Sequence, residues 1–145
     1  MGDPKELENG LIAVDTDVII DFFRDVSPAA DVLSELISRE QAALTAVSVF
    51  ELYAGVEGAK RLRQIETLLQ ELIVFPLSSL EAAMAGRIYT QLKARGKLVG
   101  THDILIAGIC VANDRPLYTK NSAHYSQIKD LRLLSADEIL TSESG

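Results

Sequence analysis

Short apolar runs alternate with longer stretches of mixed apolar and polar residues along most of the chain. The runs are too short for helices and contain many core-forming residues, so they predict buried strands. The expected strands are 11–14, 42–47, 73–77 and 117–119, with a possible fifth at 131–134.

The longer stretches carry apolar residues at helical spacing, which predicts helices between the strands. The expected helices begin near Asp17 and at Ser27, the latter running to Arg39, and continue at 48–58, 60–72, 78–96 and 101–114. Ser27 (with Pro28 in the first turn), Ser78 or Ser79, and Thr101 are the expected N-caps, and Gly96 the expected helix end.

Strands that alternate with helices predict an α/β fold with a mostly parallel sheet of four to five strands and helices on both faces. The chain has 145 residues, enough for a single domain, which we expect at 10–136 with flexible termini at 1–9 and 141–145. Ligands of such sheets bind beyond the carboxyl ends of the strands, so the functional side chains are expected there.

Composition narrows the classes of function. Hydrophobic residues make up 48% of the chain, which supplies a full core, and the net charge of −7 argues against a general nucleic-acid binder. If nucleic acid is the substrate, a metal ion has to supply part of the positive charge; a basic partner also suits this charge. The lone Cys110 sits in an apolar run and predicts a core residue, and no Cys/His spacing suggests zinc. The polar N-terminus and the absence of a long apolar run predict a soluble, cytoplasmic protein with no membrane association.

Three carboxylates stand in apolar surroundings, where an ionised group is costly unless it is compensated. Asp15 ends the first expected strand, Glu51 is the only charge in 43–56, and Asp103 is the only charge in 98–112. At the edge of a parallel sheet these side chains can converge, and their mutual repulsion favours a hard divalent cation such as Mg²⁺ or Mn²⁺. Simpler explanations stay open: Asp15 or Asp17 as helix caps, Asp103 beside a helix dipole, and Glu51 on a solvated face.

Four segments together resemble the PIN domain, in particular the VapC-type toxins of toxin–antitoxin pairs. The matching segments are VDTDVIIDFFR, TAVSVFELYAGV, GTHDILIAGICVAND and PLYTKNSAHYSQIKDLRLL. The resemblance covers about residues 10–135. It implies a single PIN-like domain that acts as a metal-dependent endoribonuclease, the toxin of a type II pair. It also implies an Mg²⁺ or Mn²⁺ cofactor, an RNA substrate, a cognate antitoxin and a homodimer.

The resemblance also assigns residues. Asp15, Glu51 and Asp103 match the family's principal carboxylates, and are therefore the expected catalytic residues and metal ligands. Supporting positions are Thr16 and Ser48 as hydroxyls that orient carboxylates, Thr119 after the fourth strand, Asp17 where Asn is commoner, and Asn121 where many members carry a fourth acid.

Neighbouring residues are expected to have lesser roles. His102 is predicted to point away from Asp103 and His124 to lie at the surface, so neither is given a catalytic role. Asp21 is expected to be a solvated helix residue, one turn past Asp17 and able to reach the rim of the site. Lys120 is the best candidate among the basic residues for guiding RNA. The apolar surface of 22–26 with helix 60–72 is the candidate groove for an antitoxin.

Two other functions remain open. Asp15 and Asp17 also resemble the D-x-D opening of haloacid-dehalogenase-type phosphatases, in which Asp15 would be the nucleophile and Asp17 the acid. The late acidic pair that such enzymes use for Mg²⁺ is missing, and Glu51 and Asp103 would have no role. The other alternative is a degenerate PIN fold that only binds a partner or RNA, which Asn121 keeps open.

Overall fold

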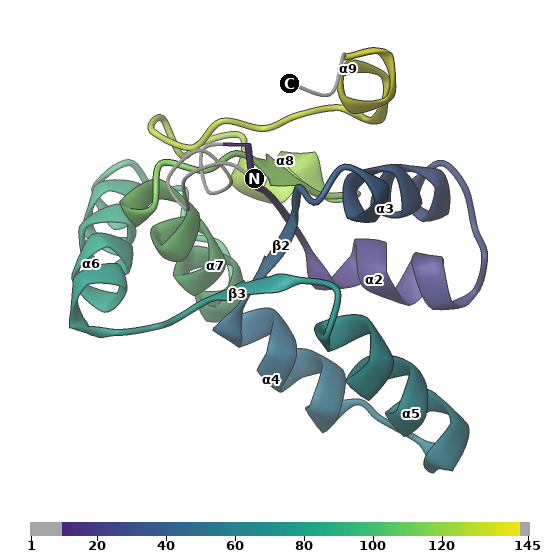
Figure 1. Cartoon of the computed structure of the whole chain (residues 1–145). Coiled ribbons are helices and arrows are strands. Elements are labelled where there is room, and N and C mark those ends of the chain that lie inside the picture. The colour runs from purple at the N-terminus through teal and green to yellow at the C-terminus, as the bar shows by residue number, and fades with distance from the viewer. Residues whose placement is uncertain (1–9, 143–145) are drawn as a thin grey trace.

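The structure, a computed structural model, describes residues 10–142 and places a parallel sheet at its centre (Figure 1). The strands are β1 (Ile12–Val14), β2 (Ala42–Thr45), β3 (Ile73–Phe75) and β4 (Leu117–Tyr118). They lie in the order β3-β2-β1-β4, and each neighbouring pair is parallel. The predicted α/β fold with a four-stranded parallel sheet is therefore confirmed.

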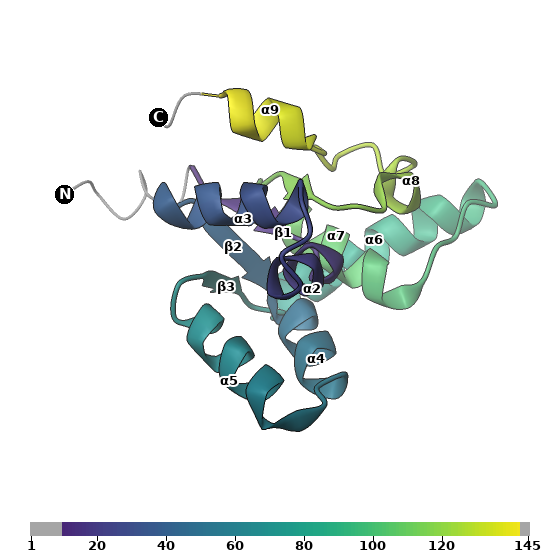
Figure 2. The ribbon, with the colours of Figure 1, turned by 90° about the vertical axis from the view of Figure 1, so that its right-hand side faces the viewer.

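Helices connect the strands and cover both faces of the sheet. They are α2 (Thr16–Phe23), α3 (Ala29–Ser38), α4 (Ala46–Ala54), α5 (Gly58–Leu69), α6 (Ser79–Ala94), α7 (Thr101–Ala112), α8 (Ser122–Tyr125) and α9 (Ala136–Thr141). Figures 1 and 2 show α6 and α7 on one side of the sheet, α2 and α3 on the other, and α4 and α5 as a pair that extends from the β3 side. None of the described helices is both long and apolar enough to cross a membrane.

Alternating residues of the strands belong to two separate hydrophobic cores, because successive side chains of a strand point to opposite faces. Ala13 and Leu117 belong to the core under α6 and α7, whereas Val14 and Tyr118 belong to the core with α2 and α3. All four are nearly inaccessible to solvent. The short strands are thus held by burial on both faces.

The contact between α6 and α7 depends on a glycine. A Cβ atom on Gly108 would lie 2.6 Å from Ala85 Cβ and 2.7 Å from the Ala85 backbone. The two helices can approach this closely only because position 108 has no side chain.

Several expected boundaries are wrong at helix starts. Pro28, not Ser27, is the N-cap of α3, and the Ser27 hydroxyl instead donates to Asp31 at 2.8 Å. Thr101 is the first residue of α7, and Gly100 is its N-cap. By contrast, Ser78 caps α6 in a capping box with Glu81, as predicted.

The observed strands are shorter than expected: 73–77 ends at Phe75, 117–119 ends at Tyr118, and 11–14 begins at Ile12. The expected strand 42–47 ends at residue 45, since Thr45 caps α4 by accepting a hydrogen bond from the Ser48 backbone N–H at 3.2 Å. The possible fifth strand at 131–134 is reduced to a single parallel bridge between Leu117 and Leu133. The pairing is too short to form a strand there.

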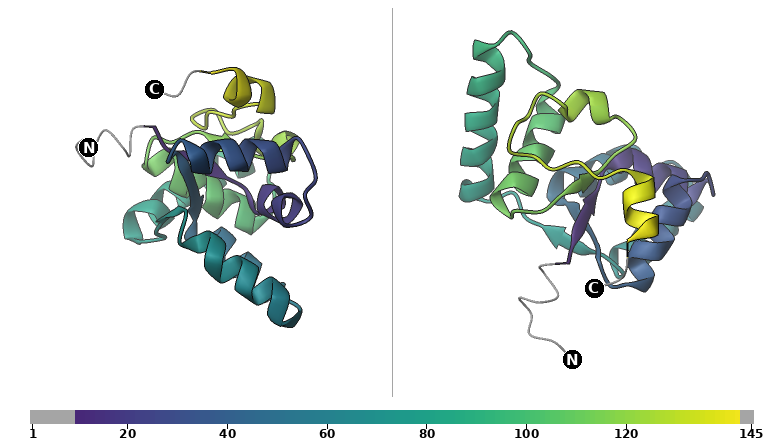
Figure 3. Two further views of the ribbon diagram at one scale, coloured as in Figure 1. Left: turned by 45° about the vertical axis from the view of Figure 1, so that its right-hand side comes forward. Right: turned by 90° about the horizontal axis from the view of Figure 1, so that it is seen from above.

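The C-terminal part of the described chain continues the domain past residue 136. Figure 3 shows α9 lying over α3. Arg39 of α3's C-cap donates to the Ile139 carbonyl at 3.2 Å and to the Ser142 carbonyl at 3.0 Å. Helix α9 therefore continues the structured region past residue 136 and includes Thr141, the first residue of the expected tail 141–145. Residues 1–9 and 143–145 of the expected tails lie outside the described residues.

Candidate functional site

The candidate site lies at the carboxyl edge of the sheet, where β1 and β4 end side by side. Beyond β1 the chain turns to β2 and β3 on one side, and it returns to β4 on the other. Such a reversal of strand order opens a crevice at the carboxyl ends, which is the usual ligand position in these sheets. Asp15 follows β1 and Thr119 follows β4, so both lie at the edge where such a crevice is expected.

Asp15 is buried and held by three donors. Its side chain Oδ1 accepts from the Thr16 backbone N–H at 2.8 Å, which makes it the N-cap of α2. Its Oδ2 accepts from the Thr119 hydroxyl at 2.8 Å and the Tyr125 hydroxyl at 3.1 Å. The residue is only 6% exposed. Asp15 therefore both caps α2 and lies at this edge of the sheet.

Tyr125 lies between the carboxylates of Asp15 and Asp103. Its phenolic oxygen also lies 3.2 Å from Asp103 Oδ1, in the first turn of α7. One phenol thus stands within hydrogen-bond distance of both Asp15 and Asp103. Sequence reasoning missed Tyr125, because it reads as an apolar position of the closing segment and no local motif marks it.

The negative charges of Asp15 and Asp103 repel one another. Burial raises the pKa of Asp15, and the neighbouring Asp103 charge adds to that rise. Hydrogen bonds from Thr119, Thr16 and Tyr125 act in the opposite direction without cancelling it. Burial, followed by the charges of Asp15 and Asp103, raises the pKa of Tyr125 far above its ordinary value, so the phenol remains a donor.

Glu51 joins the site through a hydroxyl on α2. The Thr16 hydroxyl donates to Glu51 Oε1 at 2.7 Å, and Thr16 Oγ1 lies 3.0 Å from Ser48 Oγ. Since the Thr16 backbone N–H holds Asp15, one residue ties two of the predicted carboxylates together. Of the two hydroxyls expected to orient carboxylates, Thr16 contacts Glu51 and Ser48 contacts Thr16.

The remaining predicted residues form a second group beside Asp15. Asp17 accepts from the Asn121 side-chain amide at 3.0 Å and from the Lys120 backbone N–H at 3.2 Å. Burial, followed by the charge of Asp15, raises the pKa of Asp17 to about 6. The Lys120 ammonium lies 2.6 Å from Asp21 Oδ2. Asp21 is buried, so its expected solvated position is wrong.

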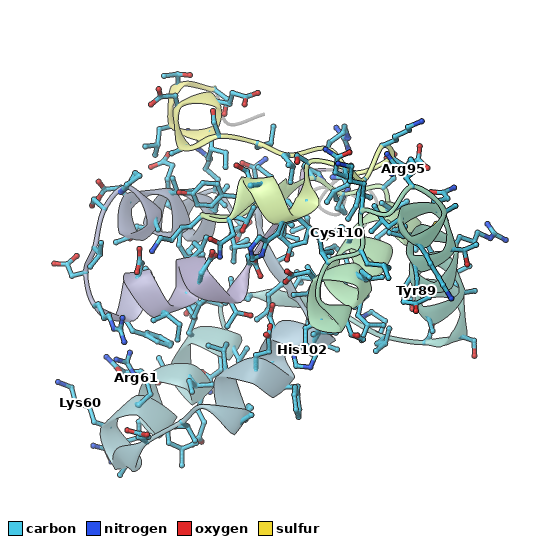
Figure 4. The ribbon with its side chains drawn as sticks, turned by 180° about the vertical axis from the view of Figure 1, so that it is seen from behind. Lys60, Arg61, Tyr89, Arg95, His102 and Cys110 are labelled. Atoms are coloured by element: carbon cyan, nitrogen blue, oxygen red, sulfur yellow. The ribbon has the colours of Figure 1, made fainter. Side chains whose placement is uncertain are left out.

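Both histidines contact carboxylates, which the sequence analysis did not predict. His102 Nδ1 is 3.3 Å from Glu51 Oε2, and Figure 4 shows His102 on the α4 side of α7. His124 is exposed, as expected, but its Nδ1 lies 3.0 Å from Asp103 Oδ2. The rotation along α7 turns His102 away from Asp103, as predicted, but toward the neighbouring helix α4, whose position the sequence pattern did not reveal.

The donor set suits a hard cation, because it consists of carboxylate oxygens. Within 10–142, no three His, Cys, Asp or Glu side chains are close enough together to form a metal-binding group. Asp15 and Asp103 nevertheless place carboxylate oxygens beside one phenol, and their mutual repulsion would be relieved by a divalent cation. Glu51 is connected to this pair through Thr16.

Comparison with known proteins identifies the family of the chain. The PIN domain family model matches residues 12–140. Ribonuclease VapC1 of Methanocaldococcus jannaschii is 32% identical over 134 residues, which cover 92% of each chain. Ribonuclease VapC10 of Mycobacterium tuberculosis is 31% identical over 122 residues, which cover 84% of this chain and 91% of that protein.

Solved structures share the fold. The VapBC2 structure from Rickettsia felis, bound to a promoter DNA fragment, matches with a TM-score of 0.76 and 19% identity, over 86% of this chain and 98% of the other. The FitAcB structure from Neisseria gonorrhoeae matches with a TM-score of 0.72 and 22% identity, over 87% and 98%. At these identities the likeness concerns the fold.

Proposed function

The chain belongs to the PIN domain family, and from this premise we propose that it is a metal-dependent endoribonuclease, the toxin of a type II toxin–antitoxin pair. The observation that carries the proposal is the pair Asp15 and Asp103 on the single phenol of Tyr125, with Glu51 connected through Thr16. Relatives of similar length named ribonucleases VapC1 and VapC10 support it.

The proposed cofactor is Mg²⁺ or Mn²⁺, with Asp15, Asp103 and Glu51 as its ligands. Carboxylate oxygens are the ligands that these hard cations prefer. When bound, the cation supplies positive charge for the phosphate and activates water for attack. This suits a chain whose own net charge is −7 and which would otherwise repel RNA.

The chain's residues hold the carboxylates in place. Thr119 and the Thr16 backbone N–H fix the two oxygens of Asp15, and the Thr16 hydroxyl orients Glu51. Ligand carboxylates of metal sites are commonly held by such hydrogen bonds. We assign Ser48, Asp17 and Asn121 supporting roles, since Ser48 contacts Thr16 and Asn121 contacts Asp17.

The two alternative functions have less support. A phosphatase would need Asp15 free to attack, but both of its oxygens accept hydrogen bonds, and Glu51 and Asp103 would be unused. A degenerate fold that only binds RNA or a partner would not need to retain two repelling carboxylates on one phenol. Asn121 contacts Asp17 rather than Asp15, so an amide there leaves the Asp15–Asp103 pair intact.

The proposed protein partner is the cognate antitoxin, and a groove suits its apolar segment. Phe22, Phe23 and Ile37 line a cavity of about 590 Å³ together with Leu68 and Thr67 of α5. The lining includes Phe22 and Phe23 of the segment 22–26 and several residues of helix 60–72, which supports this groove as the antitoxin surface. Binding to the product of the adjacent small gene, measured by calorimetry, checks this partner; a purified toxin that ignores that product contradicts it.

A homodimer and a cytoplasmic location are also part of the proposal. Phe50 and Leu77 are exposed and line one shallow surface with Val47 and Leu105, which is a candidate contact between two copies of the chain. The mass in solution, measured by light scattering, distinguishes a dimer from a monomer.

The deciding experiment compares the wild type with Asp15→Asn on structured RNAs in Mn²⁺ or Mg²⁺. Loss of a coordinating carboxylate should reduce cleavage by more than about 100-fold, since even residues that only support metal ligands cost about 10–100-fold. EDTA should abolish cleavage by the wild type. Asp130→Asn, an exposed site outside the crevice, is the matched control and should cleave normally.

Metal binding separates the outcomes. Cleavage that persists in Asp15→Asn or in EDTA contradicts the proposed chemistry. A folded wild type that binds no Mn²⁺ in calorimetry contradicts the proposed metal ligands.

A further inference from the structure

A small cavity with two arginines adjoins the candidate site. It has a volume of about 260 Å³ and lies between α2, α4 and α5. Its lining includes Ile20 and Arg24 from the α2 segment, Glu51 and Leu52 from α4, and Arg61 and Ile65 from α5. Since Glu51 lines the cavity and is also tied to Asp15 through Thr16, the cavity and the carboxylate site are neighbours.

Arg61 is held in place but lacks an acceptor. Its guanidinium carbon lies 4.8 Å from the centre of the Phe23 ring, which fixes the side chain by a cation–π contact. Its Nη1 is buried and has no hydrogen-bond partner in the described part of the chain. Figure 4 shows Arg61 on the side of α5 that faces α2, whereas the neighbouring Lys60 extends outward. A buried charged donor without an acceptor is costly, so a ligand oxygen there would be strongly stabilised.

The nearby acidic residues do not neutralise the two arginines. Among the ion pairs within residues 10–142, neither Arg24 nor Arg61 takes part in one. Glu51 is directed to Thr16 and His102, and Glu57, the other acid of the lining, is exposed. Two guanidinium groups without carboxylate partners are thus present in a chain whose net charge is −7.

We propose that Arg24 and Arg61 form a subsite for the RNA phosphate next to the scissile one. Guanidinium groups bind phosphate in a bidentate manner, and such contacts fix the register of a strand without reading its sequence. A strand that presents one phosphate to the carboxylates can place its neighbour in a cavity that shares Glu51. This inference rests on the proposed ribonuclease function and adds the positioning of the substrate.

The test measures binding of a short labelled oligouridylate as a function of salt, in an Asp15→Asn background that prevents cleavage. Arg24→Gln and Arg61→Gln should each weaken binding by about tenfold or more. Each should also reduce the slope of log affinity against log salt by about 0.7, the value for one phosphate contact of a single strand. Arg61→Lys should retain most of the slope but not the affinity, because the charge remains and the bidentate geometry is lost.

Arg87→Gln on α6 is the matched control, since Arg87 is exposed and lies outside the cavity lining. Arg24 is exposed as well, so its variant should fold even if loss of the Phe23 contact unfolds Arg61→Gln. Thermal unfolding of each variant identifies that case.

Equal behaviour of the Arg24, Arg61 and Arg87 variants overturns the subsite, even if the wild type cleaves RNA. Weakened binding to the antitoxin with unchanged binding to RNA also overturns it and assigns the cavity to a protein partner. If the salt slope depends on Arg24 and Arg61 but the wild type with Asp15 intact cleaves no RNA in Mn²⁺, the subsite is supported and the nuclease function is contradicted instead.

Discussion

Helix α7 belongs to two regions that differ in what holds them together. Near its middle, Gly108 packs against Ala85 of α6 in a closely fitted apolar contact. In its first turn, Asp103 shares the phenol of Tyr125 with Asp15, whose pKa is raised by burial and by the charge of Asp103. The first region favours the native state directly, whereas the second keeps repelling charges together. Packing changes should therefore act mainly on stability, and changes at the carboxylates on both stability and function.

The largest effect on stability is expected from Gly108→Ala. The new methyl group would meet backbone atoms of Ala85 at 2.7 Å, so α6 and α7 have to move apart. Overpacking of this kind costs about 1–3 kcal/mol, and contact with backbone places this variant at the upper end. Urea unfolding measures the loss, and Mn²⁺ binding by the folded protein should be retained.

Gly86→Ala on the opposite helix is the matched control. A Cβ atom there meets nothing within 4 Å, so the substitution should stabilise α6 by up to about 1 kcal/mol through helix propensity. Equal destabilisation by both variants would show that the close approach at Gly108 is not what limits the interface.

An intermediate effect is expected from Tyr125→Phe, which removes the shared donor and keeps the ring. Asp15 and Asp103 would lose a hydrogen bond while their repulsion remains, so the metal-free protein should lose about 2 kcal/mol of stability at neutral pH. The loss should shrink in acid, where protonated carboxyl groups no longer repel one another. Thermal unfolding in EDTA across pH measures both effects.

Tyr118→Phe supplies the comparison, since Tyr118 is also buried but its hydroxyl forms no hydrogen bond within the described chain. Its stability should change by less than about 1 kcal/mol. A loss as large as that of Tyr125→Phe would mean that ring packing, not the shared hydrogen bond, explains the effect.

The fold was predictable because its signals are local. The strand 11–14 is an apolar run followed by helical spacing, and the order of such elements along the chain determines an α/β sheet. Helix starts were less predictable. Ser27 and Thr101 carry good capping side chains, but the neighbouring residues Pro28 and Gly100 take the cap positions. Which of two adjacent residues becomes the N-cap depends on the backbone conformation of the preceding loop, which the sequence pattern does not reveal.

The candidate site was predictable only in part. Asp15, Glu51 and Asp103 stand out as charges in apolar runs, and the structure places them around α2, α4 and α7 at one edge. Tyr125 and the contact of His102 with Glu51 could not be read from spacing, because both depend on how segments far apart in the chain pack. The three proposed carboxylates left a sequence signal, and so did the hydroxyls of Thr16 and Thr119 that contact them, whereas Tyr125 left none.

The smallest effect, and the most specific in its pH dependence, is expected from Asp17→Asn. Burial and the charge of Asp15 raise the pKa of Asp17 from 3.8 to about 6. A raised carboxyl pKa means that the folded state favours the protonated form. The protonated Asp17 carboxyl group therefore contributes its full stabilisation below about pH 4, and this contribution is lost as the pH rises through about 6. Asparagine cannot ionise, so the metal-free variant should be more stable than the wild type by about 1 kcal/mol above pH 6, after allowance for partial solvent exposure.

The difference between the two proteins should disappear near pH 4, where Asp17 of the wild type is largely protonated. Denaturant unfolding in EDTA at several pH values measures it, and Asp130→Asn, at an exposed position, should show no such dependence. A variant that is less stable than the wild type above pH 6 would mean that the charged form of Asp17 is favoured by its donors, the Lys120 backbone and the Asn121 amide. Asp15 and Asp103 would then be the two carboxylates of the site that repel each other. Asp17 would instead be one of the groups that stabilise the fold.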